Sequence, residues 1–396
     1  MIEIRTLSDL TIPRGGRVFY RVDYNVPLDG TRIADATRIE ETLPTIRFLR
    51  DAGARIILAS HLGRPKGERK PKYSLAPVRE KLAEIARTEV AWSDDCTGDD
   101  VVAKSGALRE GDLLLLENLR FYAGEEKNDA GFAAELRKLA DFYVNDAFGA
   151  CHRAHASIDA LPRLFDPNDT AGGLLLAREL QFLQKVTQVS DRPFVALLGG
   201  AKIAGKIEPL EALVNLADTV LIGGGMANTF LASRQINMGG SLVDKDSIDV
   251  AARIDHGQHR ANVVLPADLV CADDLETPRV IETVEVEKGL TAGQKAFDIG
   301  PKTISEFTNE LANARTIFWN GPMGVFEKEA FAKGTIAMAR AVAESPGISV
   351  VGGGESVEAV KASGFASKIT HISTGGGASL EFISGANLPG VEVLRK

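Results

Sequence analysis

The chain has 396 residues, which at roughly 150 residues per domain predicts two or three domains, with two the simplest division. Hydrophobic residues make up 44% and charged residues 25% of the chain, a composition that excludes disordered, fibrous and membrane-embedded proteins. The net charge is -8, from 46 basic and 54 acidic residues, so the surface as a whole would repel nucleic acid and anionic lipid. Any anionic ligand therefore requires local clusters of basic residues.

The termini and cysteines indicate the compartment. The N-terminal sequence MIEIRTLSDL lacks the basic and then apolar order of a secretory signal, and no apolar run reaches the roughly 20 residues that span a bilayer. Cys96, Cys151 and Cys271 are odd in number, widely spaced and without a CxxC pair. We expect a cytoplasmic protein with reduced cysteines and no membrane or nucleic-acid partner.

Short apolar runs alternate with helical segments in the first half. The runs predict strands at 18–22, 55–59, 113–116 and 142–144. Helices are expected at 38–50, with Gly53 as the C-cap, and at 76–87 and 130–140. This alternation is typical of an α/β fold with a buried parallel sheet.

The second half repeats the same pattern after a connector. The segment 161–170 is rich in proline and aspartate, and a leucine-rich helix is predicted at 174–189. Strands are then predicted at 194–198, 219–222, 263–265, 316–319 and 349–351. We interpret the helix as the connection between two lobes.

Polar residues follow the first-half strands, where ligands bind in open parallel sheets. They are Asp23, Asn25, Ser60, His61, Arg64, Glu117, Asn118, Arg120, Asn145 and Asp146, to which Arg38 and Arg153 can be added. Four arginines and a histidine could converge on a small, multiply anionic molecule such as a phosphorylated acid. The alternative is that the arginines form structural salt bridges with Asp23, Glu117 or Asp146.

Glycine follows the second-half strands instead. The clusters are 199–200, 223–225, 321, 352–354 and 375–377. Glycine lets backbone N–H groups approach phosphate oxygens, and a helix N-terminus adds partial positive charge. The pattern predicts a nucleotide site, although single glycine pairs also serve tight turns.

The segment 200–206 matches the GxxxxGK pattern of P-loop NTPases. The next residue is Ile207, which has no oxygen to hold the Mg²⁺ that a P-loop Ser or Thr would bind. The P-loop function remains an alternative. Lys202 and Lys206 are expected on one face of a helix start, within reach of phosphate oxygens; the alternative is a solvated surface pair.

Other motifs are weaker. The segment CHRAH at 151–155 lacks a fourth zinc ligand at a usual spacing. The basic stretch 61–72 has a single nearby aromatic residue, so we interpret this stretch as a solvated loop. An RNA-binding or anion-binding module using that stretch is the competing non-enzymatic hypothesis. A dinucleotide-binding GxGxxG is missing its third glycine in both GGGMAN and GGGESV.

Nine motifs, taken together, resemble those of the phosphoglycerate kinase family. They are VDYNVP, SHLGRP, LLENLRF, VNDAFGACHRAHAS, LLGGAKIAGK, GGGMANTF, WNGPMGVFE, VGGGES and STGGGASLEF, in the family's order from Asp23 to Phe382. The resemblance implies two Rossmann-like, three-layer α/β/α lobes with mainly parallel sheets, joined by an interdomain helix. The implied domains are 1–172 for the triose phosphate, 173–189 as connecting helix, 190–380 for the nucleotide, and 381–396 returning to the first lobe.

The resemblance also implies the reaction and the site. The reaction is reversible phosphoryl transfer between 1,3-bisphosphoglycerate and MgADP, giving 3-phosphoglycerate and ATP in glycolysis. The triose-phosphate residues would be Asp23, Asn25, Arg38, His61, Arg64, Arg120 and Arg153. The catalytic groups would be Arg38, Lys202, Gly353 and Gly354, and the nucleotide residues Lys202, Lys206, Gly223, Gly224, Asn320, Glu327, Gly353, Gly354, Glu355 and Ser356.

Two positions depart from the family pattern. Glu355 stands where the family has aspartate, so the residue expected to meet the Mg²⁺ of the nucleotide carries one extra methylene. Gly205 replaces an aspartate often found between the two lysines. The family comparison further implies a monomer, and the separate ligand sets lead to the hypothesis that the lobes close to exclude water from the acyl phosphate.

Overall fold

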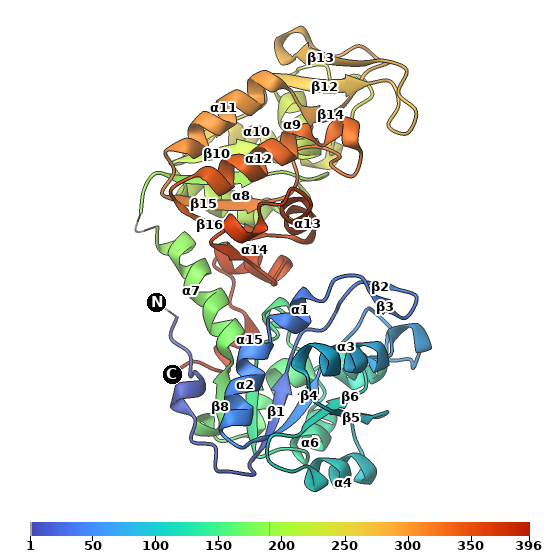
Figure 1. Cartoon of the computed structure of the whole chain (residues 1–396). Coiled ribbons are helices and arrows are strands. Elements are labelled where there is room, and N and C mark those ends of the chain that lie inside the picture. Colours follow the sequence, from blue (N-terminus) through green and yellow to red (C-terminus); the bar gives the residue numbers. More distant parts are fainter. Residues whose placement is uncertain (1, 190) are drawn as a thin grey trace. The chain divides into compact units, whose positions relative to one another are not determined.

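Two parallel sheets organise the chain, each in its own unit of structure (Figure 1). The structure is a computed structural model that describes residues 2–189 and 191–396. Unit 1 contains residues 1–181 and 387–396, and unit 2 contains residues 182–386. The domain boundary predicted at residue 190 lies outside the described residues.

The strands of unit 1 form a six-stranded parallel sheet. They are β1 (Arg17–Arg21), β4 (Arg55–Ala59), β5 (Val90–Ser93), β6 (Leu113–Leu116), β7 (Phe142–Asn145) and β8 (Thr170–Gly172). Their order is β5-β6-β4-β1-β7-β8. A separate antiparallel hairpin pairs β2 (Leu28–Asp29) with β3 (Arg32–Ile33). The carboxyl ends of β1, β4, β6 and β7 therefore share one edge.

Helices surround this sheet, as Figure 1 shows for α2, α3, α4 and α6. The helices of unit 1 are α1 (Thr37–Glu40), α2 (Leu43–Asp51), α3 (Ala76–Ala86), α4 (Asp99–Ala107), α5 (Ala123–Glu126), α6 (Ala130–Arg137) and α15 (Pro389–Glu392). The single helix predicted at 38–50 is wrong, because Pro44 in the first turn of α2 starts a new helix and separates it from α1. Gly53 follows α2 with φ +75°, as the predicted C-cap requires.

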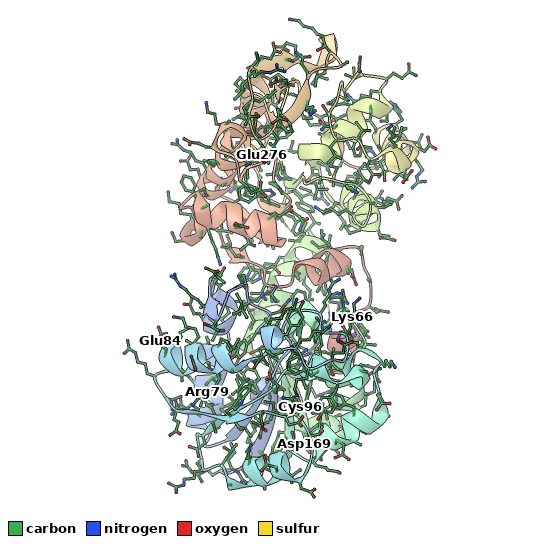
Figure 2. The ribbon with its side chains drawn as sticks, turned by 90° about the vertical axis from the view of Figure 1, so that its right-hand side faces the viewer. Lys66, Arg79, Glu84, Cys96, Asp169 and Glu276 are labelled. Atoms are coloured by element: carbon green, nitrogen blue, oxygen red, sulfur yellow. The ribbon has the colours of Figure 1, made fainter. Side chains whose placement is uncertain are left out.

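The interior of unit 1 is apolar on both faces of the sheet. On one face, Val18, Tyr20, Ile56 and Leu58 pack in a cluster with side chains of the surrounding helices. The alternate residues of the same strands, such as Phe19 and Ile57, face the other way and are also buried. In Figure 2, Cys96 lies inside this unit, whereas Glu84 on α3 projects from its outer face. Burial on both faces explains why these strands appear in the sequence as continuous apolar runs.

Unit 2 contains a second six-stranded parallel sheet. Its strands are β9 (Phe194–Leu198), β10 (Thr219–Ile222), β11 (Asn262–Val264), β15 (Thr316–Asn320), β16 (Ile348–Gly352) and β17 (His371–Ile372). The order is β11-β10-β9-β15-β16-β17. From the centre of this parallel sheet, β9, β10 and β11 follow one another toward one edge, and β15, β16 and β17 follow one another toward the other edge. Between β9 and β15 the order reverses, and ligands of such sheets bind at this point.

Two groups of mutually contacting helices accompany this sheet, α8, α9, α10 and α14 in one and α11, α12 and α13 in the other. They are α8 (Ile207–Leu216), α9 (Gly224–Ser233), α10 (Ile248–Asp255), α11 (Pro301–Ala312), α12 (Lys333–Glu344), α13 (Gly354–Ala362) and α14 (Gly377–Ile383). A three-stranded antiparallel sheet of order β13-β12-β14 completes the unit, with β12 (Asp268–Ala272), β13 (Ile281–Glu285) and β14 (Lys295–Ile299).

All nine predicted strands are present, with ends within one residue of the prediction. The prediction missed β5, which is half-exposed along its middle, and the short strands β8 and β17. It also missed the antiparallel sheet, because β13 is exposed over its first three residues, contains Glu282 and Glu285, and lacks an apolar run. The α/β class with mainly parallel sheets is confirmed.

Helix α7 (Leu174–Gln188) begins in unit 1 beside a buried carboxylate. Asp146, directly after β7, accepts hydrogen bonds from Tyr20 Oη (2.7 Å), Thr45 Oγ1 (2.6 Å) and the backbone N–H of Leu176 (2.8 Å). Burial raises the pKa of Asp146 to about 6, although these donors oppose the shift. A carboxylate at a helix N-terminus satisfies amides that have no partner within the helix, so Asp146 fixes where α7 begins.

The C-terminal residues pack on unit 1. Ile4 forms an isolated bridge with Arg395, and Lys396 Nζ lies 2.9 Å from Asp9 Oδ1. The N–H of Gly390 donates to the carbonyl of Cys151 at 3.0 Å. The two ends of the chain therefore meet in unit 1. In the described part of the chain, no helix combines the length and the apolar character that a bilayer crossing needs.

We expect replacement of Asp146 by asparagine to change the pH dependence of stability. The folded-state pKa of Asp146 is raised from 3.8 to about 6, so its stabilising contribution is complete below the unfolded pKa and is lost as the pH rises through the folded pKa. In urea denaturation, the free energy of unfolding of the wild type relative to Asp146→Asn should therefore fall between about pH 4 and pH 6.5. A difference that stays constant or rises over this range would contradict the assignment.

Candidate active site

The carboxyl ends of β1 and β4 bring charged side chains together in unit 1. Asp23 follows β1, His61 follows β4, and Arg38 lies on α1. Arg38 Nη1 donates to Asp23 Oδ2, and His61 Nε2 lies 3.8 Å from Asp23 Oδ1. Burial acts to raise the pKa of Asp23, but the guanidinium groups of Arg38 and Arg21 outweigh it and hold the pKa below its ordinary range. An ionised Asp23 therefore holds Arg38 at this edge of the sheet.

A fully buried arginine, Arg21, lies beneath this cluster at the end of β1. Its Nε donates to Ser157 Oγ at 2.7 Å, and its Nη2 lies 3.8 Å from Glu125 Oε1. Glu125 is itself buried and accepts hydrogen bonds from both Ser157 N (2.9 Å) and Ser157 Oγ (2.6 Å). Arg21 was not predicted as a site residue, although a charge at the end of a buried strand indicates that it must have partners.

Arg21 also fixes the tautomer of His61. Its Nη2 lies 3.2 Å from His61 Nδ1, and a guanidinium has donors and no acceptor. Nδ1 therefore accepts, and Nε2 carries the proton. Burial lowers the pKa of His61 well below its ordinary value, with Asp23 opposing the shift and Arg21 reinforcing it. His61 is thus a neutral imidazole that offers one N–H donor.

Asn25 and Arg120 meet at the backbone of Gly63. Asn25 Oδ1 accepts from Gly63 N at 2.8 Å, and Arg120 Nη1 donates to Gly63 O at 2.8 Å. Arg120 is 6% exposed, and its Nε lies 3.4 Å from Glu126 Oε1. These contacts join the strand ends of β1, β4 and β6 through one loop.

Arg64 and Arg153 are exposed. Arg153 Nε donates to His152 Nε2 at 2.9 Å, and within residues 2–189 and 191–396 Arg64 makes no hydrogen bond or ion pair. Glu117 accepts from Leu75 N (2.8 Å), and neither it nor Asp146 pairs with one of the predicted site arginines in the described part of the chain. Salt bridges therefore hold Arg38, to Asp23 as the alternative named, and Arg120, to Glu126, but no salt bridge of Arg64 or Arg153 occurs within the described residues.

The residues of the CHRAH segment do not form a metal cluster. Cys151 is buried and free, and burial together with Arg120 and other cations lowers the pKa of His155 to about 3. Across residues 2–189 and 191–396, no group of three His, Cys, Asp or Glu side chains is arranged to hold a metal ion.

Unit 2 contains a pocket of about 620 Å³ beside the loops that follow β9 and β15. A volume of this size suits a small organic ligand, and the location is the point where the strand order reverses. The lining residues are Gly200, Ala201, Gly225, Asn228, Gly240, Ser241, Leu242, Val243, Leu275, Lys295, Ala296, Phe297, Pro322, Gly324, Val325, Glu327 and Glu355.

The pocket combines apolar walls with charged groups. Leu242, Val243 and Phe297 supply apolar surface, and the predicted residues Glu327 and Glu355 supply carboxylates. These apolar residues were not predicted from the sequence, because Leu242, Val243 and Phe297 lie outside the predicted strands and carry no chemical group that indicates a ligand. Near the pocket, Lys328 Nζ pairs with Glu276 Oε2 at 2.6 Å, and Figure 2 shows Glu276 in unit 2.

Lys202 and Lys206 are not on one helical face, as the sequence analysis predicted. Helix α8 begins at Ile207, so Lys202 lies in the preceding loop and Lys206 at the N-cap. Lys202 is exposed, whereas Lys206 is half-buried and donates to the Gly199 carbonyl at 2.9 Å. Burial lowers the pKa of Lys206, and the nearby Glu355 opposes that shift. Positive φ values at Gly200 and Gly205 account for the loop.

The predicted residues after β16 divide into open and buried positions. Gly353 is the N-cap of α13 with φ +92°, and no other atom lies within 4 Å of a Cβ placed at Gly354. In contrast, Ser356 Oγ is buried and accepts from the N–H of Gly321. Asn320 Nδ2 donates to the Gly352 carbonyl at 2.9 Å. Asn320 and Ser356 therefore join the loops after β15 and β16.

Gly223 and Gly224 are close to the loop after β9. A Cβ on Gly224 would lie 2.9 Å from both the nitrogen and the carbonyl oxygen of Gly200, so the backbones meet at a distance that only glycine permits. Gly224 also has φ +63°. This packing supports a structural role for these glycines, alongside any contact with a ligand.

Comparison with known proteins agrees with this architecture. Residues 7–386 match the family model described as phosphoglycerate kinase. The phosphoglycerate kinase of Geobacter metallireducens is 48% identical over 396 residues, 99% of each chain, and that of Acidobacterium capsulatum is 51% identical over 388 residues, 95% of this chain and 96% of the relative. The solved phosphoglycerate kinase of Coxiella burnetii has a TM-score of 0.88 at 35% identity, covering 99% of both chains. That of Pyrococcus horikoshii has a TM-score of 0.87 at 32% identity, covering 99% of this chain and 98% of the other.

The chain belongs to the phosphoglycerate kinase family. The activity expected from the sequence is confirmed at this level. The protein is a phosphotransferase of glycolysis that reversibly transfers a phosphoryl group from 1,3-bisphosphoglycerate to ADP, giving 3-phosphoglycerate and ATP. The P-loop alternative is set aside, since the match covers the segment 200–206 within this family. The structure adds that Lys206 occupies the N-cap position of α8 without a side-chain capping bond and that Ile207 opens the helix.

We expect His61 to remain neutral and in one tautomer across the physiological pH range. Burial lowers its pKa well below the ordinary value, and Arg21 occupies Nδ1. In ¹H–¹⁵N spectra of a histidine-labelled protein, the His61 ring signals should show a protonated Nε2 and stay constant from about pH 6 to pH 8.5. The exposed His256 provides a reference in the same spectra. Movement of the His61 signals with a midpoint near 6.5 would contradict the assignment.

Proposed function

We propose that the two ligands of the reaction divide between the two units. In this proposal residues 1–172 bind the triose phosphate, 190–380 bind the nucleotide, 173–189 connect them, and 381–396 return to the first part. The observation that carries the division is the difference in chemistry: Arg38, Arg120 and a neutral His61 follow strands of one sheet in unit 1, and a pocket with apolar walls lies in unit 2. The first suits a small polyanion, and the second suits a base and ribose.

In unit 1, Arg38, Arg64, Arg120 and Arg153 would bind the carboxylate and phosphate of 3-phosphoglycerate. Guanidinium groups form bidentate bonds with such oxygens. Asp23, Asn25 and His61 would position the arginines and offer hydrogen bonds to the hydroxyl and carboxylate groups. Arg38 would lie nearest to the transferred phosphoryl group. Asp23 supports this role, because its carboxylate accepts from Arg38 and so orients that guanidinium at the edge of the sheet.

In unit 2, Lys202, Lys206 and the N-terminus of α13 at Gly353 and Gly354 would bind nucleotide phosphates. Gly223 and Gly224 would flank the base, and Glu327 would contact the ribose. Asn320 and Ser356 would hold the loops after β15 and β16 together through their hydrogen bonds to the backbone. The exposed ammonium of Lys202 is free to follow the migrating charge, which supports its catalytic role.

The chemistry requires no general base. A carboxylate oxygen of 3-phosphoglycerate attacks the γ-phosphorus of ATP, the bond between that phosphorus and the β,γ-bridging oxygen breaks, and ADP leaves with the electron pair. The attacking carboxylate has a pKa of roughly 3.5 to 4 and is already ionised near neutral pH. Catalysis is therefore positioning and charge neutralisation. Direct transfer requires the two ligands to meet, so the proposal includes closure of the units during turnover.

Mg²⁺ bound to the nucleotide is the proposed cofactor. A carboxylate of Glu355 lines the pocket, and no three-residue metal cluster occurs in the described part of the chain. This donor set fits Mg²⁺, which commonly takes one or two carboxylates together with substrate phosphates. When bound, the ion would neutralise phosphate charge. We further propose a cytoplasmic monomer with no nucleic-acid partner, which the net charge of -8 supports.

Replacement of Arg38 or Lys202 by alanine tests the residue roles. Each change removes a charge expected to act on the phosphoryl group in flight, so kcat should fall by roughly 10³-fold or more. The assay follows ADP release from ATP and Mg²⁺, which should require 3-phosphoglycerate. The matched control is Arg47→Ala, an exposed arginine on α2 that should retain near-wild-type kcat. Near-normal turnover of both variants would contradict the assignment.

A further inference from the structure

We propose that Asp298 is a positioning residue for the nucleotide pocket of unit 2, because its buried carboxylate holds the pocket wall formed by residues 321–327 against β14 and the start of α12. The inference rests on the proposed function, since it takes this pocket as the nucleotide site. Asp298 lies directly after the pocket-lining residues of β14 and is 3% exposed.

Both oxygens of the Asp298 carboxylate are engaged by backbone donors. Oδ2 accepts from the N–H of Gly334 at 2.7 Å, in the first turn of α12, and Oδ1 accepts from the N–H of Ile299 at 2.9 Å. The positive end of the α12 dipole faces the carboxylate. Asp298 thereby joins the strand that lines the pocket to a twelve-residue helix.

Two glycines allow the wall to approach this carboxylate. A Cβ at Gly324 would overlap Asp298 Oδ1 and lie 2.6 Å from the carbonyl oxygen of Phe297, and a Cβ at Gly334 would also overlap Oδ1. Gly324 belongs to the pocket lining, so the carboxylate lies directly behind the wall. Backbone contact at this distance leaves no room for a larger group at either position.

The rest of the wall is tied to the same elements. Val325 N donates to the Phe297 carbonyl at 2.8 Å, and Met323 N donates to Thr335 Oγ1 at 3.0 Å. The wall also carries Glu327, the proposed ribose contact. Any shift of β14 relative to α12 would therefore change the position of Glu327 and Val325 together.

Burial of this carboxyl is costly. Burial raises the pKa of Asp298 to about 7, and the N–H donors of Gly334 and Ile299 only partly oppose the shift. An apolar side chain would fill this position without that cost but could not accept the two N–H groups. A carboxyl at this position therefore sets the geometry of the wall at a cost to the stability of the folded protein.

Unit 2 offers a matched control in Asp268. This aspartate is 2% exposed, lies on β12 of the same small sheet, and accepts from Lys302 N (3.0 Å) and Thr303 N (2.8 Å) at the start of α11. A Cβ at Gly300 would overlap its carboxylate. Asp268 repeats the local arrangement of Asp298, but it is not among the residues that line the pocket, and its carboxylate accepts from Lys302 and Thr303 of α11.

The experiment compares steady-state kinetics of the full chain with Asp298→Asn and Asp268→Asn. The amide of asparagine can accept one N–H but presents its own donor to the second. We expect Asp298→Asn to raise the KM for MgADP by about tenfold, with kcat within about threefold and the KM for 1,3-bisphosphoglycerate unchanged. We expect Asp268→Asn and Asp298→Asn to lower the thermal midpoint of unfolding by similar amounts. Asp268→Asn should leave both KM values unchanged. Equal KM values for MgADP in the two variants would overturn the inference.

A third variant distinguishes failure of this inference from failure of the proposed function. Val325→Trp places a larger side chain in the pocket wall and should raise the KM for MgADP in either case. If Val325→Trp has no effect, the pocket is not the nucleotide site and both proposals fail. If Val325→Trp acts but Asp298→Asn does not, the positioning role of Asp298 alone is wrong.

Hydrogen exchange of the wild-type protein provides a test that requires no variant to fold. MgADP should slow exchange of the Val325 and Gly334 amides together, since both report on the wall and its anchor. Adding 3-phosphoglycerate alone should leave them unchanged. Protection of Val325 without any change at Gly334 would overturn the coupling that the inference requires.

Discussion

Repulsion between negatively charged phosphates is the constraint on which the rest of this structure depends. The chain carries a net charge of -8 and acts on ligands that are themselves polyanions, so its positive charge must be concentrated locally. In unit 1, carboxylates that lie among the arginines reduce the repulsion between the positive charges. Asp23 neutralises Arg38, and buried Glu125 lies 3.8 Å from Arg21, so the charges can lie together at one sheet edge without an unpaired buried ion.

Unit 2 meets the same constraint with less side-chain charge. Its sheet reverses strand order between β9 and β15, and the loops that follow these strands carry glycine where they approach each other, so their backbones meet directly. Gly200 and Gly224 show why: any side chain at Gly224 would enter the neighbouring loop. The result is a pocket with apolar walls, which suit a base, and with the carboxylates of Glu327 and Glu355 in its lining. In the proposed function, Lys202, Lys206 and the start of α13 would bind the phosphates. Asp298 extends this logic behind the wall, where a carboxylate and two close glycines set the spacing of strand and helix.

Much of this could be predicted from the sequence, and the failures have physical causes. Strands buried on both faces, such as Leu113–Leu116, can be predicted because they appear in the sequence as continuous apolar runs. The polar residues that follow them indicate the edge of the sheet where a ligand would bind. The break between α1 and α2 was missed because helical periodicity continued across Pro44. The helical placement of Lys202 failed because the glycine at 205 extends the loop to Lys206. Arg21, Leu242 and Asp298 gave no motif, since their roles depend on neighbours that are distant in sequence.

Calorimetric titration of each ligand separately, against variants of each unit, tests the central claim most directly. The account predicts that Arg64→Ala weakens 3-phosphoglycerate binding by at least about tenfold and leaves MgADP binding unchanged, because its guanidinium is free for a small anion. Glu327→Ala should show the opposite pattern, with weaker MgADP binding and unchanged 3-phosphoglycerate binding. If Arg64→Ala left 3-phosphoglycerate binding intact, or if either variant weakened both ligands equally, the division of the two polyanions between the units would be contradicted.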